Sequence, residues 1–123
     1  MKILNLEQFR KLPENTLFSK YEPCVFQNLE IKGETWECDF LTQEIASAVE
    51  CDSSGDFCDR LEEAKMSGDS IPIDLDCEGR DGCFDNDQLF AVWEKDDVAK
   101  LIERLSLCIS NDQVEFQEGS AAE

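Results

Sequence analysis

Six carboxylates crowd the segment DLDCEGRDGCFDNDQ, residues 74–88, together with one arginine and two glycines. Acidic side chains and a glycine stand at positions 1, 3, 5 and 6 of a calcium-loop pattern that begins at Asp74, and Asp85 stands at position 12. At position 12 the pattern expects a longer, bidentate glutamate, and a strand rather than a helix is predicted to enter the loop. The pattern therefore favours a solvated acidic loop, with calcium binding at Asp74–Asp85 as an alternative.

Other catalytic and metal chemistry finds little support in the residue types. The chain has no histidine, which excludes Ser-His-Asp and Cys-His catalysis and imidazole metal ligands. It has no glycine motif of the GxxxxGK[ST] kind that cradles phosphate. Acid–base catalysis by carboxylates would need a deep pocket with two opposed carboxylates, one with its pKa raised by burial. Because these acids lie in very polar sequence, we predict a non-enzymatic protein with no catalytic residue, metal ligand or cofactor.

Seven cysteines are many for 123 residues. The pairs Cys51/Cys58 and Cys77/Cys83 are spaced more widely than the C-x2–4-C knuckles of zinc sites, so buried thiols are favoured over a four-thiolate zinc site. The number is odd, and Met1 leads into polar sequence without the apolar core of a secretion signal. These features disfavour a fully paired disulfide framework and predict a cytoplasmic location.

The distribution of charge is the strongest functional signal. There are 29 acidic and 11 basic residues, for a net charge of −18, and residues 44–87 alone carry fourteen acidic and three basic groups. Such a field repels DNA, RNA and anionic membranes and attracts basic proteins. No apolar stretch approaches the roughly 18 residues of a membrane span. We therefore expect a basic protein partner, no direct contact with nucleic acid and no membrane insertion.

We predict that the acids of the middle third form a recognition surface. Carboxylates on alternate residues of an extended strand recur roughly every 6.6 Å, at about 3.3 Å per residue, a spacing similar to that of phosphates along a nucleic-acid strand. Such acids would occupy a Lys/Arg-lined groove through many weak Coulomb interactions that salt screens. Arg80 is expected to fold back onto a carboxylate and shape the loop. The predicted partner-binding residues are Asp52, Asp56, Asp59, Glu62, Glu63, Asp74, Asp76, Glu78, Asp81, Asp85 and Asp87.

Helix signals and alternation predict the elements of the N-terminal third. Asn5 can cap a helix over residues 6–12, with Gln8 completing a capping box. Alternating apolar and polar residues then predict strands over 16–23, 24–33 and 34–41. A tight turn is expected at Lys32-Gly33, between the second and third of these strands.

The remaining elements alternate between helix and strand. We predict a short helix around residues 45–49, a helix over 56–68 that ends at Gly68, an edge strand over 70–76, a central strand over 88–95 and a helix over 97–108 capped by Asp96. These elements predict an α+β fold with a small, largely antiparallel sheet and three to four helices. The expected organisation is a single α+β domain over 1–110 and a flexible acidic tail over 111–123.

Two segments resemble known proteins. LFSKYEPCVFQNLEIKG (17–33) and DLDCEGRDGCFDNDQLFAVWEKDDVAKLIERL (74–105) are similar to segments of small acidic proteins encoded by bacteriophages and prophages. The resemblance covers about two fifths of the chain and carries no catalytic motif. It implies a context that includes anti-CRISPR and anti-restriction proteins, many of which block the nucleic-acid site of a host defence complex.

Three functional hypotheses follow. The first is a phage-type inhibitor in the host cytoplasm, which binds a basic nucleic-acid-handling host protein, such as a CRISPR effector, through the acidic surface of residues 51–87. The second is a calcium-binding or calcium-stabilised module. The third is a small structural or regulatory phage protein whose acids serve solubility, a hypothesis that an exposed apolar patch would favour. The sequence is compatible with a monomer or a homodimer.

Overall fold

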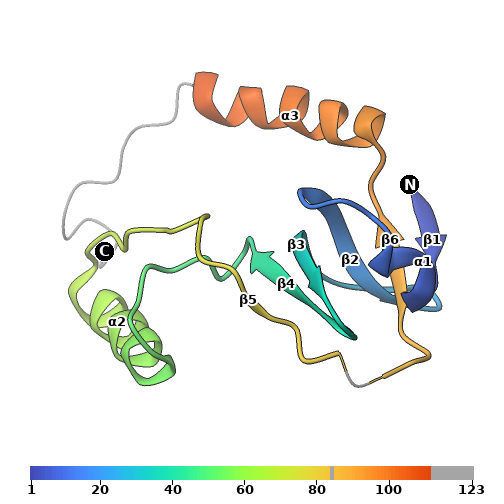
Figure 1. Ribbon diagram of the computed structural model, residues 1–123. Coiled ribbons are helices and arrows are strands. Elements are labelled where there is room, and N and C mark those ends of the chain that lie inside the picture. Colours follow the sequence, from blue (N-terminus) through green and yellow to red (C-terminus); the bar gives the residue numbers. More distant parts are fainter. Residues whose placement is uncertain (84, 112–123) are drawn as a thin grey trace.

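The computed structural model describes residues 1–83 and 85–111, and within them it contains an antiparallel sheet and three helices (Figure 1). This arrangement confirms the α+β class, with three helices where three to four were predicted. The division into a domain over 1–110 and a tail stays a prediction, because residues 112–123 lie outside the described residues. The elements are β1 (Lys2–Leu4), α1 (Leu6–Arg10), β2 (Thr16–Glu22), β3 (Val25–Trp36), β4 (Asp39–Glu44), α2 (Ser54–Ser67), β5 (Gly79–Arg80), β6 (Leu89–Val92) and α3 (Lys95–Ser110).

The sheet has six strands in the order β1-β6-β2-β3-β4-β5, and every neighbouring pair is antiparallel. The central strand predicted within 88–95 is confirmed as β6, which lies between β1 and β2 and has Phe90, Ala91 and Val92 buried. The two outer strands are short, with three residues in β1 and two in β5. Strand β1 was not predicted, because three residues are too few for a visible alternation.

Helix α1 covers one face of the sheet, and its capping box is confirmed. The Asn5 side chain accepts a hydrogen bond from the Gln8 backbone N–H at 2.9 Å, and the Gln8 side chain accepts one from the Asn5 N–H at 3.0 Å. These bonds satisfy backbone donors that a helix start leaves unpaired. Leu6 and Phe9 are the buried residues of this helix, so the cap fixes the direction in which both enter the core.

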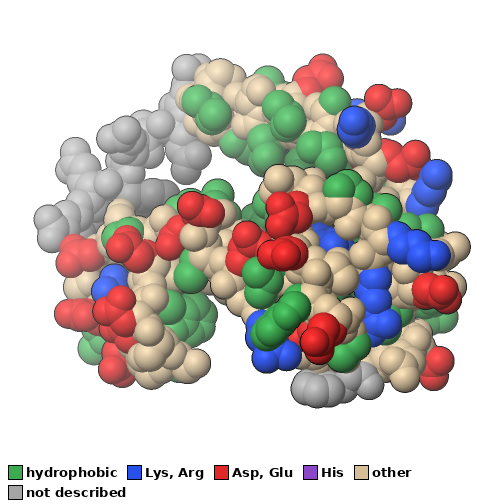
Figure 2. All heavy atoms as spheres, in the orientation of Figure 1, with side chains coloured by type: hydrophobic (Ala, Val, Ile, Leu, Met, Phe, Trp, Pro, Cys, Tyr) green, Lys and Arg blue, Asp and Glu red, His purple; other side chains and the backbone are tan. Residues whose placement is uncertain are grey.

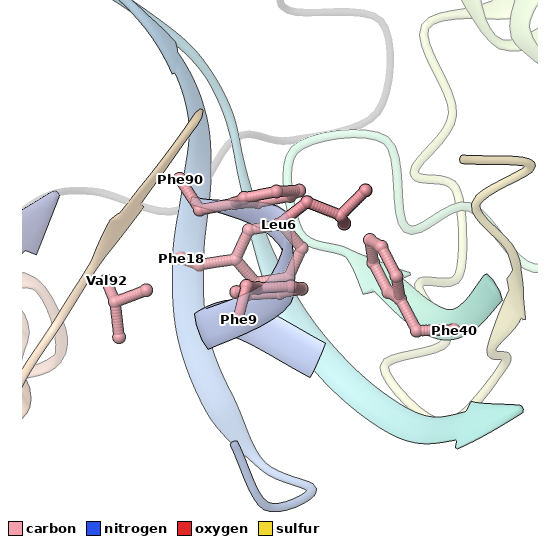
Figure 3. Close-up of a cluster of buried hydrophobic side chains, with 6 residues drawn as sticks. All are labelled: Leu6, Phe9, Phe18, Phe40, Phe90 and Val92. Carbon is pink, nitrogen blue, oxygen red and sulfur yellow. The ribbon is translucent and has the colours of Figure 1, made fainter. Parts of the chain in front are cut away.

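Phe9 lies at the centre of the hydrophobic core (Figure 3). Its ring stacks on Phe90 with centroids 4.0 Å apart, and meets Phe18 and Phe40 edge-on at 4.7 and 5.0 Å. Leu6 and Val92 complete the buried cluster. A five-residue helix is thus held by one aromatic side chain that contacts three different strands, β2, β4 and β6.

Strands β2, β3 and β4 form a meander whose second turn differs from the prediction. The prediction of a tight turn at Lys32-Gly33 is wrong, because β3 continues to Trp36. The chain reverses instead at Glu37 and Cys38, and Glu37 has a φ of 53°. Gly33 instead allows a close approach, because a Cβ there would stand 2.9 Å from the Leu41 Cβ and overlap the Glu78 carboxylate.

Two predicted elements do not form. Residues 45–49, expected to be a short helix, follow β4 as a turn that ends in a single bridge between Val49 and Ile73. The same bridge is the only strand-like pairing of the predicted strand 70–76, where Ile73 is 68% exposed. Residues 45–49 had apolar residues at helical spacing, but Ala48 is buried without a helix. Residues 70–76 had the apolar alternation of a strand, but only Val49 pairs with them.

Helix α2 is confirmed, although it begins at Ser54 and not at residue 56. Ser53 caps its start by accepting a hydrogen bond from the Asp56 N–H at 3.1 Å, and Gly68 ends it in the left-handed conformation at φ 78°. Phe57 and Ala64 are only half-buried, and no residue of the helix is fully buried. Figure 1 shows α2 beyond the β4–β5 end of the sheet, away from α1.

Helix α3 follows β6 and is likewise confirmed, but Glu94, not Asp96, is its N-cap. Its apolar positions recur at helical spacing, and yet the side chains of Ile102, Leu105 and Ile109 are 62%, 49% and 90% exposed. Figure 2 shows hydrophobic side chains along this helix, including the side turned toward the sheet. Among the described residues no helix is long and apolar enough to cross a membrane.

Candidate protein-binding surface and a polar pocket on the sheet

The first five predicted binding acids lie on α2 and the loop before it. Asp52, Asp59, Glu62 and Glu63 are exposed to solvent. Asp56 is half-buried and accepts hydrogen bonds from the Asp52 N–H and from Arg60 Nε, each at 2.9 Å. The backbone bond from Asp52, followed by the Arg60 side chain, lowers the pKa of Asp56. Asp56 therefore organises the start of α2, and the other four remain available to a partner.

The acids of residues 74–87 lie on an irregular loop and not on a strand. Asp76, Glu78, Asp85 and Asp87 are exposed, and Asp74 is half-buried. Asp74 and Asp85 each accept a hydrogen bond at 2.9 Å from the backbone N–H two residues later, which is the geometry of an Asx turn. A regular spacing of carboxylates along an extended strand is therefore wrong for this segment, although most of its acids do reach the surface.

The basic groups of residues 44–87 do little to neutralise this surface. Arg60 is paired with Asp56, and Arg80 donates from Nε to Asp39 at 3.1 Å while stacking on Trp36, as expected for an arginine folded back onto a carboxylate. Lys65 is the remaining basic residue of that stretch. In Figure 2, Asp and Glu side chains gather over α2 and the segments beside it, whereas most Lys and Arg side chains on this face lie over the region of β1, β2 and α1.

Asp81 differs from the other predicted acids because it points inward. Its side chain is 4% exposed, and Oδ1 forms an ion pair with Lys20 Nζ at 2.7 Å. Its second oxygen, Oδ2, is buried and has no hydrogen-bond partner. Burial alone would lower the pKa of Lys20, but the hydrogen bond and charge of Asp81 outweigh it and raise that pKa. Asp81 belongs to a pocket in the body of the molecule and not to the exposed acidic surface.

This pocket is polar, has a volume of about 210 Å³, and opens on the sheet between β2, β3, β4 and the loop that follows β5. A second buried carboxylate in it is Glu30, whose side chain accepts a hydrogen bond from Thr42 Oγ1 at 3.0 Å. Burial raises the pKa of Glu30, and the bond from Thr42 only partly opposes that shift. The lining residues are Lys20, Gln27, Asn28, Glu30, Thr42, Glu44, Arg80 and Asp81.

No motif or residue spacing in the sequence indicated the pocket. Leu29-Glu30-Ile31-Lys32 alternates apolar and charged residues, which is typical of a strand with one solvated face. In the structure Glu30 and Lys32 lie on the face that α1 partly covers, and both are buried. The buried Glu30 and Asp81 side chains in one pocket meet part of the requirement stated above for acid–base catalysis. Of the two, only Asp81 was among the predicted site residues, and it was predicted to bind a partner from the surface.

The carboxylate of Asp39 fixes the wall of the pocket that carries Arg80 and Asp81. It accepts hydrogen bonds from the backbone N–H groups of Phe40, Gly82 and Cys83 at 2.8, 3.0 and 3.2 Å, and from Arg80 Nε. Burial alone would raise the pKa of Asp39, but these donors together hold it below its ordinary value. We refer to this set of bonds as the Asp39 latch.

The structure gives no support to a metal site among the residues that it describes. No group of three or more Cys, Asp or Glu side chains there is placed to hold an ion, which includes the acids proposed for a calcium loop. All seven cysteines are free thiols. Five of them are exposed, contrary to the expectation of buried thiols, and Cys51 and Cys83 are partly buried.

No protein-family model matches the chain, and searches of curated proteins and of solved structures found no match either.

Replacing Asp39 by alanine is expected to destabilise the fold. Three backbone N–H groups and Arg80 lose their acceptor, so the free energy of unfolding should fall by roughly 2–4 kcal/mol in urea denaturation. The contribution should be complete above the ordinary pKa of 3.8 and disappear as the pH falls through the lowered value. Asp59→Ala, at an exposed acid, serves as the control and should change stability by less than about 0.5 kcal/mol. Equal stability of the two variants would contradict the role of the latch.

Replacing Glu30 by glutamine is expected to stabilise the protein at neutral pH. A carboxyl whose pKa is raised on folding destabilises the folded state once the pH exceeds its ordinary value of 4.5, and glutamine removes that charge while keeping an acceptor for Thr42. The melting temperature of Glu30→Gln should exceed that of the original chain at pH 7, and the difference should shrink toward pH 4.5. A difference independent of pH would show that ionisation of Glu30 is not its cause.

Proposed function

We propose that the protein is a non-enzymatic, phage-type inhibitor of the anti-CRISPR or anti-restriction kind. It acts in the host cytoplasm by occupying a basic, nucleic-acid-binding surface of a host defence complex. The observation that carries the proposal is the exposed acidic surface formed by α2 and by the loop over residues 69–78. The two arginines near this surface, Arg60 and Arg80, form ion pairs with Asp56 and Asp39. The resemblance of two segments to small acidic phage proteins supports the same choice.

The physical basis is a sum of weak, long-range attractions. Each exposed carboxylate adds a small Coulomb term toward a basic groove, and the summed field speeds association more than it tightens any one contact. Asp59 and Glu63 stand one turn apart on α2, with Glu62 beside them, so three charges share a short stretch of helix surface. A groove that normally holds phosphates would meet these side chains without any deep insertion.

Reversing the charge of α2 is expected to weaken binding to a purified CRISPR effector. The triple variant Asp59→Lys, Glu62→Lys and Glu63→Lys should raise the Kd at least tenfold, on the order expected for several lost charge contacts, by biolayer interferometry at about 50 mM salt. Affinity of the original chain should fall steeply between about 50 and 500 mM salt.

A matched variant separates the location of the charge from its amount. Glu14→Lys, Glu22→Lys and Glu34→Lys change the net charge equally at exposed acids outside residues 44–87. This variant should bind at least three times more tightly than the α2 variant, on the order expected when only long-range terms change. Equal weakening by the two variants, or affinity that salt leaves unchanged, would reject the proposed surface.

A second candidate function is that of a small structural or regulatory protein, and the exposed apolar face of α3 favours it. Val98, Leu101, Ile102, Leu105 and Ile109 fall on one side of this helix, and the last three are largely exposed. Helix α3 carries three acidic and three basic residues, so it is neutral in a chain of net charge −18. A second copy of the chain is therefore the occupant that this face fits, because two such helices can pair without charge repulsion.

This candidate predicts a dimer that a change on one side of α3 dissociates. Sedimentation at about 100 μM should show a dimer for the original chain and a monomer for Leu105→Asp, because desolvating a carboxylate opposes apolar pairing. Leu107→Asp, at an exposed residue on the opposite side of the helix, is the control and should remain dimeric. A monomeric original chain would eliminate this candidate and leave the inhibitor proposal untouched.

A further inference from the structure

We infer that the polar pocket on the sheet receives one arginine side chain of the basic partner. The inference rests on the proposed function, since it assigns a point of contact within the same encounter. It starts from Asp81, which stands in the wall of the pocket with one oxygen satisfied by Lys20 and the other without a hydrogen-bond partner.

An unpaired buried carboxylate oxygen is costly, and its retention calls for an explanation. Asp81 Oδ2 lies in a side chain that is only 4% exposed, so bulk water does not compensate it. A modest rotation about the Cβ–Cγ bond would present this oxygen to a donor in the pocket. A charged donor arriving from a partner would supply the missing bond.

The charges that line the pocket favour a cation. It contains three carboxylates, Glu30, Glu44 and Asp81, against two basic side chains, Lys20 and Arg80. Lys20 forms an ion pair with Asp81, and Arg80 forms one with Asp39, which is not a lining residue. The negative charge of Glu44, at the exposed rim, is therefore not compensated by a basic residue of the lining, and it faces an incoming side chain first.

The distribution of acceptors favours arginine over lysine. Asp81, Glu30 and Glu44 come from three separate parts of the lining, and the exposed residues Gln27 and Asn28 add side-chain amides. A planar guanidinium offers five N–H donors in fixed directions, whereas an ammonium is a compact point charge with three. A volume of about 210 Å³ admits the end of such a side chain. The pocket adjoins the loop that carries the 74–87 acids, so an arginine can enter while the rest of a basic surface meets α2.

The test uses the isolated protein, so that its result does not depend on the partner. Side-chain amide signals of Gln27 and Asn28 are followed by NMR during titration with L-arginine amide and with L-citrulline amide, which has nearly the same shape without the charge. We expect saturable shifts with arginine amide and at least tenfold weaker binding of citrulline amide, on the order that loss of charge-assisted hydrogen bonds gives. Lysine amide should also bind more weakly than arginine amide. No saturable shift, or binding of citrulline amide or lysine amide as tight as that of arginine amide, would overturn the inference.

Variants assign the binding to the pocket. Glu44→Gln and Asp81→Asn should each weaken the binding of arginine amide at least about threefold, as expected for loss of a charged acceptor, whereas Glu34→Gln, at an exposed acid outside the lining, should leave it unchanged. If Asp81→Asn does not fold, the binding of arginine amide by Glu44→Gln decides the question, because the Glu44 side chain is exposed and its replacement leaves the fold intact. If Glu44→Gln binds arginine amide as tightly as the original chain, the pocket is rejected as the site, even where α2 binds an effector in a salt-dependent way. If Glu44→Gln weakens arginine amide binding but the protein does not bind an effector, the pocket stands and only the proposed partner is rejected.

Discussion

The hydrogen bonds that the Asp39 carboxylate accepts hold the acidic loop after β5 against the sheet. The carboxylate accepts three backbone N–H bonds and one from an arginine, and these donors belong to its own strand and to a loop more than forty residues away. Backbone donors in a loop this close to the core need an acceptor. After β5 the Asp81 N–H donates to the Phe40 carbonyl, and the Asp39 carboxylate accepts from the next two residues, Gly82 and Cys83. The next residue of β4, Phe40, packs into the aromatic core. Two consecutive residues of one strand therefore connect the hydrophobic cluster to the acidic loop.

One face of the sheet is divided into an apolar and a polar part. Phe18 and Phe90 pack against α1, while Glu30 and Lys20 on the same face border the pocket. Lys32 marks the boundary: its side chain is almost fully buried, lies over the Phe9 ring, and donates to the Gly33 carbonyl at 3.1 Å and to Thr35 Oγ1 at 2.6 Å. Burial lowers the pKa of Lys32. The short helix α1 covers only the apolar part, which leaves the polar groups to satisfy one another.

Local signals predicted the fold where they are self-contained. The capping box at Asn5, the stop at Gly68 and the apolar strand at Leu89–Val92 each act within a few residues, and each is confirmed. The predictions that failed concern segments whose structure depends on contacts with residues far away in the sequence. Gly33 stays within a strand because β4 and Glu78 approach it, and the alternation of 70–76 forms no strand because only Val49 pairs with it. Exposure of the α2 acids followed from composition, whereas the inward turn of Asp81 depends on Lys20 and Asp39, which lie far away in the sequence.

The brevity of the two outer strands has a consequence for how recognition of any kind can work. Strands of three and two residues offer few free backbone groups, so strand addition by another chain at either edge would gain little. A partner must then read side chains alone. Such recognition can be retuned one residue at a time without disturbing the sheet, which suits a surface whose target changes faster than the scaffold that carries it.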